Sequence, residues 1–163
     1  MALSAHAAAL FLIAALPISL FVAWSDLSRM KIPNVAVGAL ALAYAVLGLI
    51  ALPFDAYLWG WAQLGIVLVI GIVLNAVGAV GAGDAKFAAA AAPMIAPGDV
   101  RQLLVLFSVC LLAGYVTHRA AKFSPLRRAV PQWESWTSGR RFPMGFPLGM
   151  TLVFYLIAAL LQG

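Results

Sequence analysis

The sequence predicts an all-α membrane protein, a polytopic bundle of six transmembrane helices with both termini outside the cytoplasm. Three observations predict this class. The 163 residues are 65% hydrophobic and only 9% charged, whereas soluble domains average about 45–50% apolar and about 25% charged residues. The apolar runs are hydrophobic on every side, as in 64–74, and do not alternate like the strands of a membrane barrel. The basic residues gather in alternate connections between these runs.

Six apolar runs divide the chain, and they predict a single membrane-embedded domain. A helix needs about 20 residues to cross a bilayer. The fourth run is short, so we expect either a half-buried helix or a wet bilayer edge near Asp84. Pro33 suits the start of the second helix, because the first helical turn does not need its N–H. The expected spans are about 5–25, 35–52, 56–80, 84–97, 100–118 and 142–161.

The positive charges predict the orientation of the chain. Of its ten Lys and Arg residues, only Arg101 lies outside the first, third and fifth connections. Because cytoplasmic loops carry the excess of Lys and Arg, these three connections are expected in the cytoplasm. The loop 119–141 is expected to meet anionic lipid headgroups. Because membrane topology accounts for the basic charge, no nucleic-acid partner is expected. The Lys and Arg residues of these three connections are Arg29, Lys31, Lys86, Arg119, Lys122, Arg127, Arg128, Arg140 and Arg141.

Metal-ligating side chains are sparse and widely spaced. Cys110 is the one cysteine, and His6 and His118 are far apart in the sequence. Structural zinc sites need paired Cys or His ligands at short spacing. We therefore expect no metal and no cofactor.

Two of the five acidic residues are candidates for catalysis. Asp55 and Asp99 lie in short outward turns beside Pro or Gly, where turn chemistry explains them, and Glu134 lies in the basic loop. Asp26 and Asp84 instead each end an apolar run at the cytoplasmic face. Two carboxyl groups brought close share a proton, so the ionised one can activate water while the protonated one donates to a carbonyl oxygen. This arrangement predicts an aspartic protease, which needs no metal, thiol or cofactor.

Small residues and a lysine flank Asp84. Gly81 and Gly83 remove side chains beside it, which permits unusual backbone angles or close approach of a helix or an extended substrate. The sequence allows two interpretations of Lys86. It either holds the local field positive around a carboxylate or extends its amine to the headgroups.

Two motifs resemble those of the prepilin peptidases, which are membrane aspartic proteases of the GxGD class. The segment DLSRMKIPN, from Asp26 to Asn34, resembles their signature of an aspartate followed by IPN. The segment GAGDAK, from Gly81 to Lys86, resembles their GxGDxK signature. The order of the motifs and the six-helix layout match as well. The resemblance implies that Asp26 and Asp84 are catalytic, supported by Gly81, Gly83, Lys86, Ile32, Pro33 and Asn34.

The resemblance also implies a substrate and a cellular location. Prepilin peptidases hydrolyse the bond after the leader glycine of type IV prepilins at the cytoplasmic face of the bacterial inner membrane. The bifunctional members carry an N-terminal methyltransferase domain with paired CxxC motifs, which this sequence lacks. It therefore resembles the short TadV/CpaA-like form of Flp (tight-adherence) pilus systems, which implies cleavage without N-methylation. The implied partners are prepilins and membrane lipids; cleavage of pseudopilins and the oligomeric state are left open.

Two other functions are compatible with a small polytopic protein. One is a transporter subunit in which Asp26 and Asp84 relay a proton or cation. The other is a catalytically silent membrane partner in a secretion system. Both acids lie at one membrane face and both motifs are intact, and these observations favour the protease.

Overall fold

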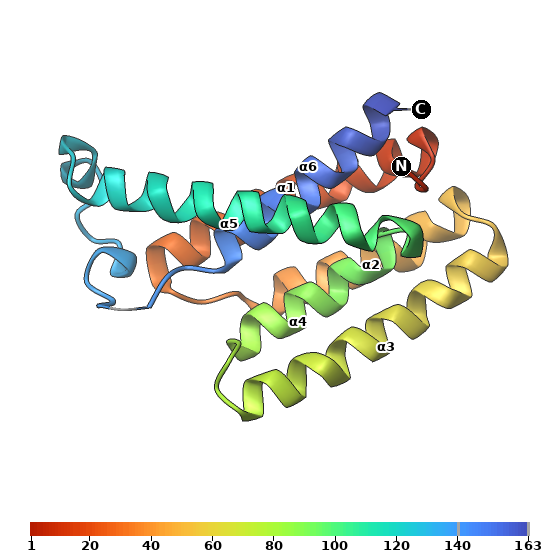
Figure 1. Ribbon diagram of the computed structural model, residues 1–163, viewed down its shortest axis with the longest axis horizontal. Helices are drawn as coiled ribbons and strands as arrows, with labels where there is room; N and C mark the ends of the chain where they lie inside the picture. Colours follow the sequence, from red (N-terminus) through yellow and green to blue (C-terminus); the bar gives the residue numbers. More distant parts are fainter. Residues whose placement is uncertain (140, 163) are drawn as a thin grey trace.

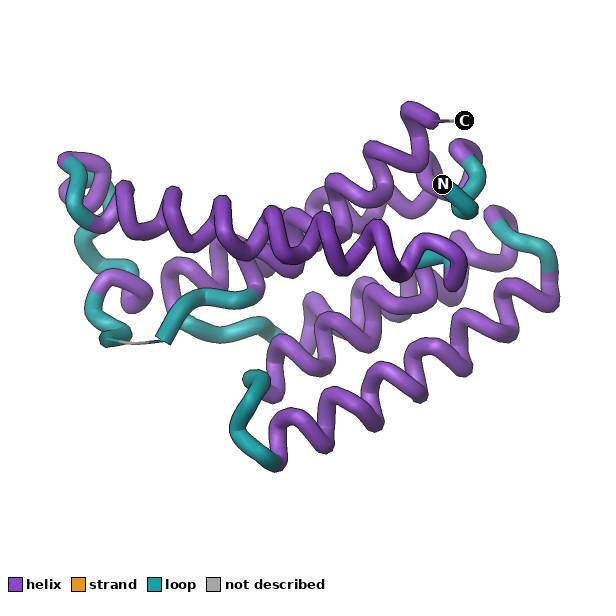
Figure 2. The backbone as a smooth tube through the Cα atoms, viewed as in Figure 1, coloured by secondary structure: helices purple, strands orange, loops and turns teal. Residues whose placement is uncertain are grey.

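The computed structural model of the chain describes residues 1–139 and 141–162. Arg140, one of the basic residues counted above, lies outside the described residues. These contain six α-helices joined by loops and short 3-10 turns, and no strand (Figure 2). The all-α prediction is confirmed. The helices are α1 (Ala5–Arg29), α2 (Asn34–Ala51), α3 (Phe54–Ala76), α4 (Ala82–Ala91), α5 (Val100–Lys122) and α6 (Gly145–Gln162).

Five of the six described helices are long and apolar enough to cross a membrane, so the chain is a multi-pass membrane protein. The exception is α4, whose 10 residues span about 15 Å, against a hydrocarbon core of about 30 Å. A 3-10 turn, η1 (Ala92–Met94), follows it directly. The chain runs back and forth along the bundle, so that its two ends lie close together (Figure 1). There the Met1 ammonium group donates to Gln162 Oε1 at 2.9 Å.

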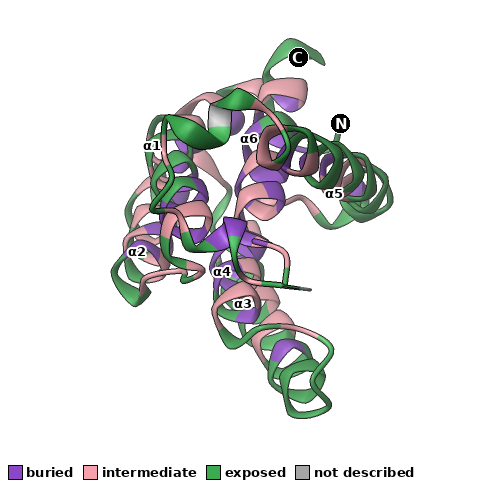
Figure 3. Cartoon of the chain, turned by 90° about the vertical axis from the view of Figure 1, so that its left-hand side faces the viewer, coloured by how far each residue is buried: buried purple, intermediate pink, exposed green. Residues whose placement is uncertain are grey.

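The centre of the bundle is the pair α1 and α6, which pack along each other. A methyl group added at Gly149 would lie 3.0 Å from the Ser19 carbonyl oxygen, so small residues let the two backbones approach closely. Figure 3 shows buried residues concentrated between these helices. Only 11% of the apolar stretch of α3 and of α5 is buried, against 50% for α6. The outer helices therefore present apolar side chains to the lipid.

Two turns bring the motif segments to one end of the bundle. Helix α1 ends at Arg29 because Met30 adopts the left-handed conformation (φ 52°, ψ 38°) and donates its N–H to the Asp26 carbonyl. Pro33 then precedes α2 in an extended conformation. Helix α3 ends at Ala76, four residues before the end expected from the sequence. The reason is the turn that follows, where Gly78 takes φ +74°, which glycine adopts without steric cost.

Asp99, which the sequence predicts to be a turn residue, also makes hydrogen bonds to distant parts of the chain. It is buried at the N-cap of α5, near the opposite end of the bundle from Asp26. Its carboxylate accepts the N–H groups of Ala2 and Leu3 and the hydroxyl of Tyr155, at 2.8–3.2 Å. Asp99 therefore ties the N-terminal segment and α6 to the start of α5. Asp55, in contrast, is exposed in the first turn of α3, where the helix dipole favours a carboxylate.

Candidate active site

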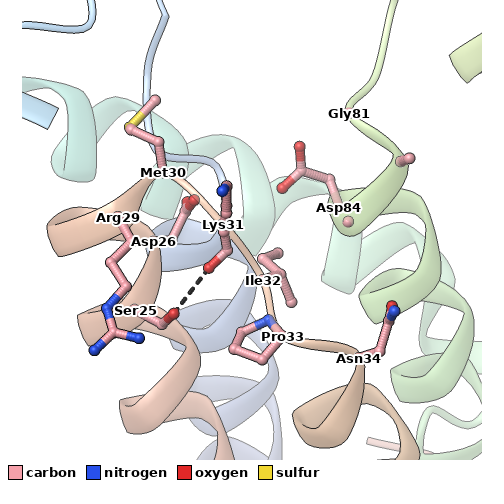
Figure 4. A pocket seen from close by; sticks show the side chains of 12 residues that line it. Ser25, Asp26, Arg29, Met30, Lys31, Ile32, Pro33, Asn34, Gly81 and Asp84 are labelled. Carbon is pink, nitrogen blue, oxygen red and sulfur yellow. Dashed lines mark hydrogen bonds between the residues drawn. The ribbon is translucent and has the colours of Figure 1, made fainter. Parts of the chain in front are cut away.

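A pocket of about 530 Å³ opens where α1 ends and α4 begins. It is lined by residues 25–26, 29–34 and 81–84, so the two sequence motifs form its opposite walls. Asp26 projects from the α1 side and Asp84 from the α4 side, and they face each other across the pocket (Figure 4). The fold therefore brings together two carboxyl groups that are far apart in the sequence.

Asp26 is held in place by the start of α6. Its side chain is buried, with 5% of the residue exposed, in the last turn of α1. The Gly145 N–H donates to Asp26 Oδ2 at 2.6 Å. Gly145 is the first residue of α6, and N–H groups at a helix start have no partner within the helix. This hydrogen bond therefore satisfies a free backbone donor and fixes the orientation of the Asp26 carboxyl group.

Asp84 lies half-buried in the first turn of α4. Burial is the main cause that raises its pKa to about 6, and the charge of Asp26 raises it further, while a hydrogen bond from the Gly81 N–H acts in the opposite direction. The negative charge of Asp26 thus favours the protonated form of Asp84. Asp84 therefore keeps its proton to higher pH than an ordinary aspartate does, because burial and the charge of Asp26 both disfavour its ionised form.

Three glycines leave the room that this arrangement needs. A methyl group added at Gly81 would lie 2.5 Å from Asp84 Oδ2, and one at Gly83 would lie 3.2 Å from Ile32 Cβ. One at Gly145 would lie 3.0 Å from both Asp26 Oδ2 and Ile32 Cδ1. Ile32 thus fits between the starts of α4 and α6. None of the three glycines has a positive φ, so lack of space, and not backbone conformation, is the reason for glycine.

A side-chain hydrogen bond joins the two motifs beside the pocket. Lys86 Nζ donates to Asn34 Oδ1 at 3.3 Å. Asn34 is the first residue of α2, and Pro33 is its N-cap. Lys86 is exposed and does not line the pocket. The sequence left two roles open for Lys86. This contact gives it a third, which is to link α4 to α2.

Gly145 is the residue of the candidate site that sequence reasoning missed. The spacing of Pro143, Gly145, Pro147 and Gly149 shows that the last helix begins irregularly. Nothing in that spacing indicates a contact with Asp26, 119 positions away. Only the close packing of α6 on α1 creates that contact.

Within the described part of the chain, no three His, Cys, Asp or Glu side chains lie close enough to hold a metal ion. The chemistry that the arrangement itself offers is that of the two carboxyl groups. One of them can accept a proton from water while the other donates one to a carbonyl oxygen.

Comparison with known proteins places the chain in a family. The model of the type IV leader peptidase family matches residues 9–117, more than half of the chain. The matched region contains Asp26, the IPN segment and the GAGDAK segment, and it ends before Gly145. No curated protein and no solved structure matches the chain. The resemblance deduced from the two motifs is confirmed: the chain belongs to the type IV leader peptidase family.

Proposed function

We propose that this protein is an aspartic endopeptidase that removes the leader peptides of Flp-like type IV prepilins at the cytoplasmic face of the inner membrane. One observation carries the proposal: Asp26 and Asp84, from the two motifs of a leader peptidase, face each other across one pocket. A transporter is less well supported, because a relay across the membrane needs ionisable groups at several depths, and these two share one end of the bundle.

The two carboxyl groups have complementary roles in the proposed reaction. Water lies between them, and the Asp26 carboxylate takes one of its protons as the water oxygen bonds to the scissile carbonyl carbon. Asp84 donates its proton to the carbonyl oxygen, which stabilises the tetrahedral intermediate. When the intermediate collapses, the C–N bond breaks and the proton held by Asp26 passes to the departing amine. One hydroxyl of the intermediate returns its proton to the Asp84 carboxylate as the C=O bond re-forms. The positive shift in the pKa of Asp84 supports its role as the acid.

The distribution of charge supports the proposed orientation. The basic connections and the pocket share one end of the bundle, and the positive-inside rule assigns that end to the cytoplasm. A prepilin carries a short basic leader, a glycine and then an apolar helix that lies in the membrane. A pocket at the cytoplasmic ends of the helices would meet the bond between these parts of the substrate.

The pH dependence of cleavage follows from the pKa of Asp84. Its value of about 6 is above that of an ordinary aspartate, so the protonated form persists to higher pH and is lost as pH rises through 6. We expect kcat/KM to fall about tenfold per pH unit well above pH 6, measured with purified enzyme and a full-length prepilin. A rate that stays constant from pH 5 to pH 9 would contradict the assignment of Asp84 as the acid.

The absence of paired CxxC motifs from this sequence predicts cleavage without methyl transfer. We expect the purified protein, given a prepilin and S-adenosylmethionine, to release a pilin with a free, unmethylated N-terminal amine. Intact-mass measurement of the product checks this. A product heavier by one methyl group would show a second activity that the proposal does not contain.

A further inference from the structure

An apolar groove of about 280 Å³ lies between α4 and α5, and the buried residues Thr151 and Leu152 of α6 form its floor. Among the described helices, α3 packs on α4 and α5 packs on α6, but neither α3 nor α4 packs closely on α5. Figure 3 shows α5 standing apart from α3 and α4. None of the residues that line the groove is charged. Because α3, α5 and α6 are long and apolar enough to span the membrane, the groove opens toward the lipid.

The α4 wall of the groove lies on the face of the helix that carries Asp84. Successive residues of an α-helix are about 100° apart around its axis. On that scale Ala88 and Ala91, which both line the groove, lie about 40° and about 20° to either side of Asp84. The rise of about 1.5 Å per residue places them about 6 Å and about 10 Å further along the helix. The groove therefore begins about one helical turn beyond the candidate catalytic carboxyl group, on the same face.

The direction of α4 also relates the groove to the proposed substrate. Asp84 lies in the first turn of α4, and from there the helix runs toward the opposite end of the bundle (Figure 1). In a prepilin, the residues that follow the scissile bond form an apolar helix in the membrane. A substrate whose scissile bond lies between Asp26 and Asp84 would therefore continue into the membrane along α4, past the groove.

The walls of the groove suit contact with a helix. On the α4 side, Ala88, Ala91 and Ala92 present only methyl groups, and small residues let helices approach each other closely in a membrane. On the α5 side, Leu104 is 59% exposed and offers a large apolar side chain. One turn of an α-helix, about 10 Å wide and about 5.4 Å long, needs more space than the groove has. A partner helix would therefore lie along the groove and insert one row of its side chains.

Another apolar groove, of about 250 Å³ between α1 and α2, lacks this relation to the catalytic pair. The residues that line it include Pro17 and Phe21 of α1. Pro17 precedes Asp26 by nine positions, which places it about 180° from Asp26 around the helix axis. A substrate helix in that groove would be separated from the Asp26 carboxyl group by α1 itself. The groove beside α4 is therefore the better matched of the two.

We propose that the groove between α4 and α5 receives the apolar helix of the prepilin and thereby holds the scissile bond at the catalytic pair. The proposal rests on the proposed function, because it assigns a second contact surface to the same substrate. A lipid acyl chain also fits an apolar groove. The alignment with Asp84 favours the substrate, since an acyl chain has no requirement to lie on the catalytic face of α4.

The first test is site-specific photo-cross-linking in membranes that contain a full-length prepilin. The photoreactive residue p-benzoylphenylalanine takes the place of Leu104, in an Asp84→Asn background that is expected to leave the substrate uncut. The matched control carries it in place of Val105, the next residue of α5, which is 61% exposed and does not line the groove. The probe at Leu104 is expected to attach to the apolar segment of the prepilin, as mapped by mass spectrometry. The probe at Val105 is expected to attach to lipid.

The second test is kinetic and places a larger side chain in the groove. Ala88→Leu is expected to raise KM for a full-length prepilin about tenfold with little change in kcat, because the substrate helix loses apolar contacts. Ala62→Leu is the matched control, since Ala62 is an exposed alanine of α3 that does not line the groove. It is expected to keep the parental KM. Thermal unfolding of both variants checks that they are folded.

The outcomes separate this inference from the proposed function. Parental protein that cleaves no prepilin would overturn the proposed function, and this inference with it. If the parental protein does cleave, three results would overturn the inference alone. They are equal attachment to the prepilin from both probe positions, attachment to lipid alone from Leu104, and a parental KM in folded Ala88→Leu. Attachment to lipid alone would identify the groove as a site for an acyl chain.

Discussion

Replacing either carboxyl group of the pair by an amide is expected to lower the rate of prepilin cleavage by about a thousand-fold or more. Asp26→Asn leaves no carboxylate to take the proton from water. Asp84→Asn leaves no acid for the carbonyl oxygen. Because proton transfer by a positioned group contributes about 10²–10⁴-fold to a rate, and the two groups act on one intermediate, the double variant is expected to be no worse than either single variant. Initial rates with purified proteins measure this.

Asp55→Asn is the matched control, since Asp55 is an exposed aspartate in the first turn of α3. It is expected to cleave at the parental rate. Asp84→Asn is also expected to unfold at a temperature no lower than the parent at pH 7, because the raised pKa of Asp84 means that its ionised form is disfavoured in the folded protein. A folded Asp26 or Asp84 variant that retains a tenth of the activity would rule out the proposed pair.

Gly145→Ala is expected to reduce kcat by about tenfold while KM changes little. The added methyl group would lie 3.0 Å from Asp26 Oδ2, so it would push the carboxyl group away from the N–H that orients it. Relieving this contact takes a shift of a few tenths of an ångström. Because a misplacement of about 1 Å at a catalytic group costs about a hundred-fold, this smaller shift is expected to cost about tenfold. Gly145 does not line the pocket, so substrate binding is expected to persist. Steady-state kinetics that separate kcat from KM measure the effect.

Gly38→Ala serves as the control for this substitution, because Gly38 lies in α2 and has open space around it. It is expected to leave both constants unchanged, and the better helix propensity of alanine favours folding at this position inside α2. Parental kcat in Gly145→Ala would show that the hydrogen bond to Asp26 does not position the catalytic group.

The candidate site was largely predictable because its residues lie in two short motifs. Asp26 and Asp84 each follow an apolar run, and the alternation of basic connections assigned both to one end of the bundle. The chain has to turn after each of these runs, near Met30 and near Gly78. A polar segment marks the first turn and a glycine-rich segment marks the second. Local composition therefore carried most of the information about this pocket.

The remaining features depend on contacts that local sequence does not encode. The hydrogen bond from Gly145 to Asp26 exists because α6 packs on α1 through small residues such as Gly149. Asp99 looks like a turn residue, but its carboxylate is buried by α6 and the N-terminal segment. The imidazole of His118 likewise has a defined environment only after the loop folds back and Trp136 stacks on it. Each depends on tertiary packing between distant segments.

Cleavage of a prepilin inside cells tests the central claim most directly. The protein would be co-expressed with a tagged Flp-type prepilin in a bacterial host that lacks its own prepilin peptidase, with Asp26→Asn and Asp84→Asn beside it. The predicted result is a pilin that begins immediately after the leader glycine with the parental protein, and intact prepilin with both variants. Stable parental protein that leaves several different prepilins intact would contradict the account and favour a silent secretion partner.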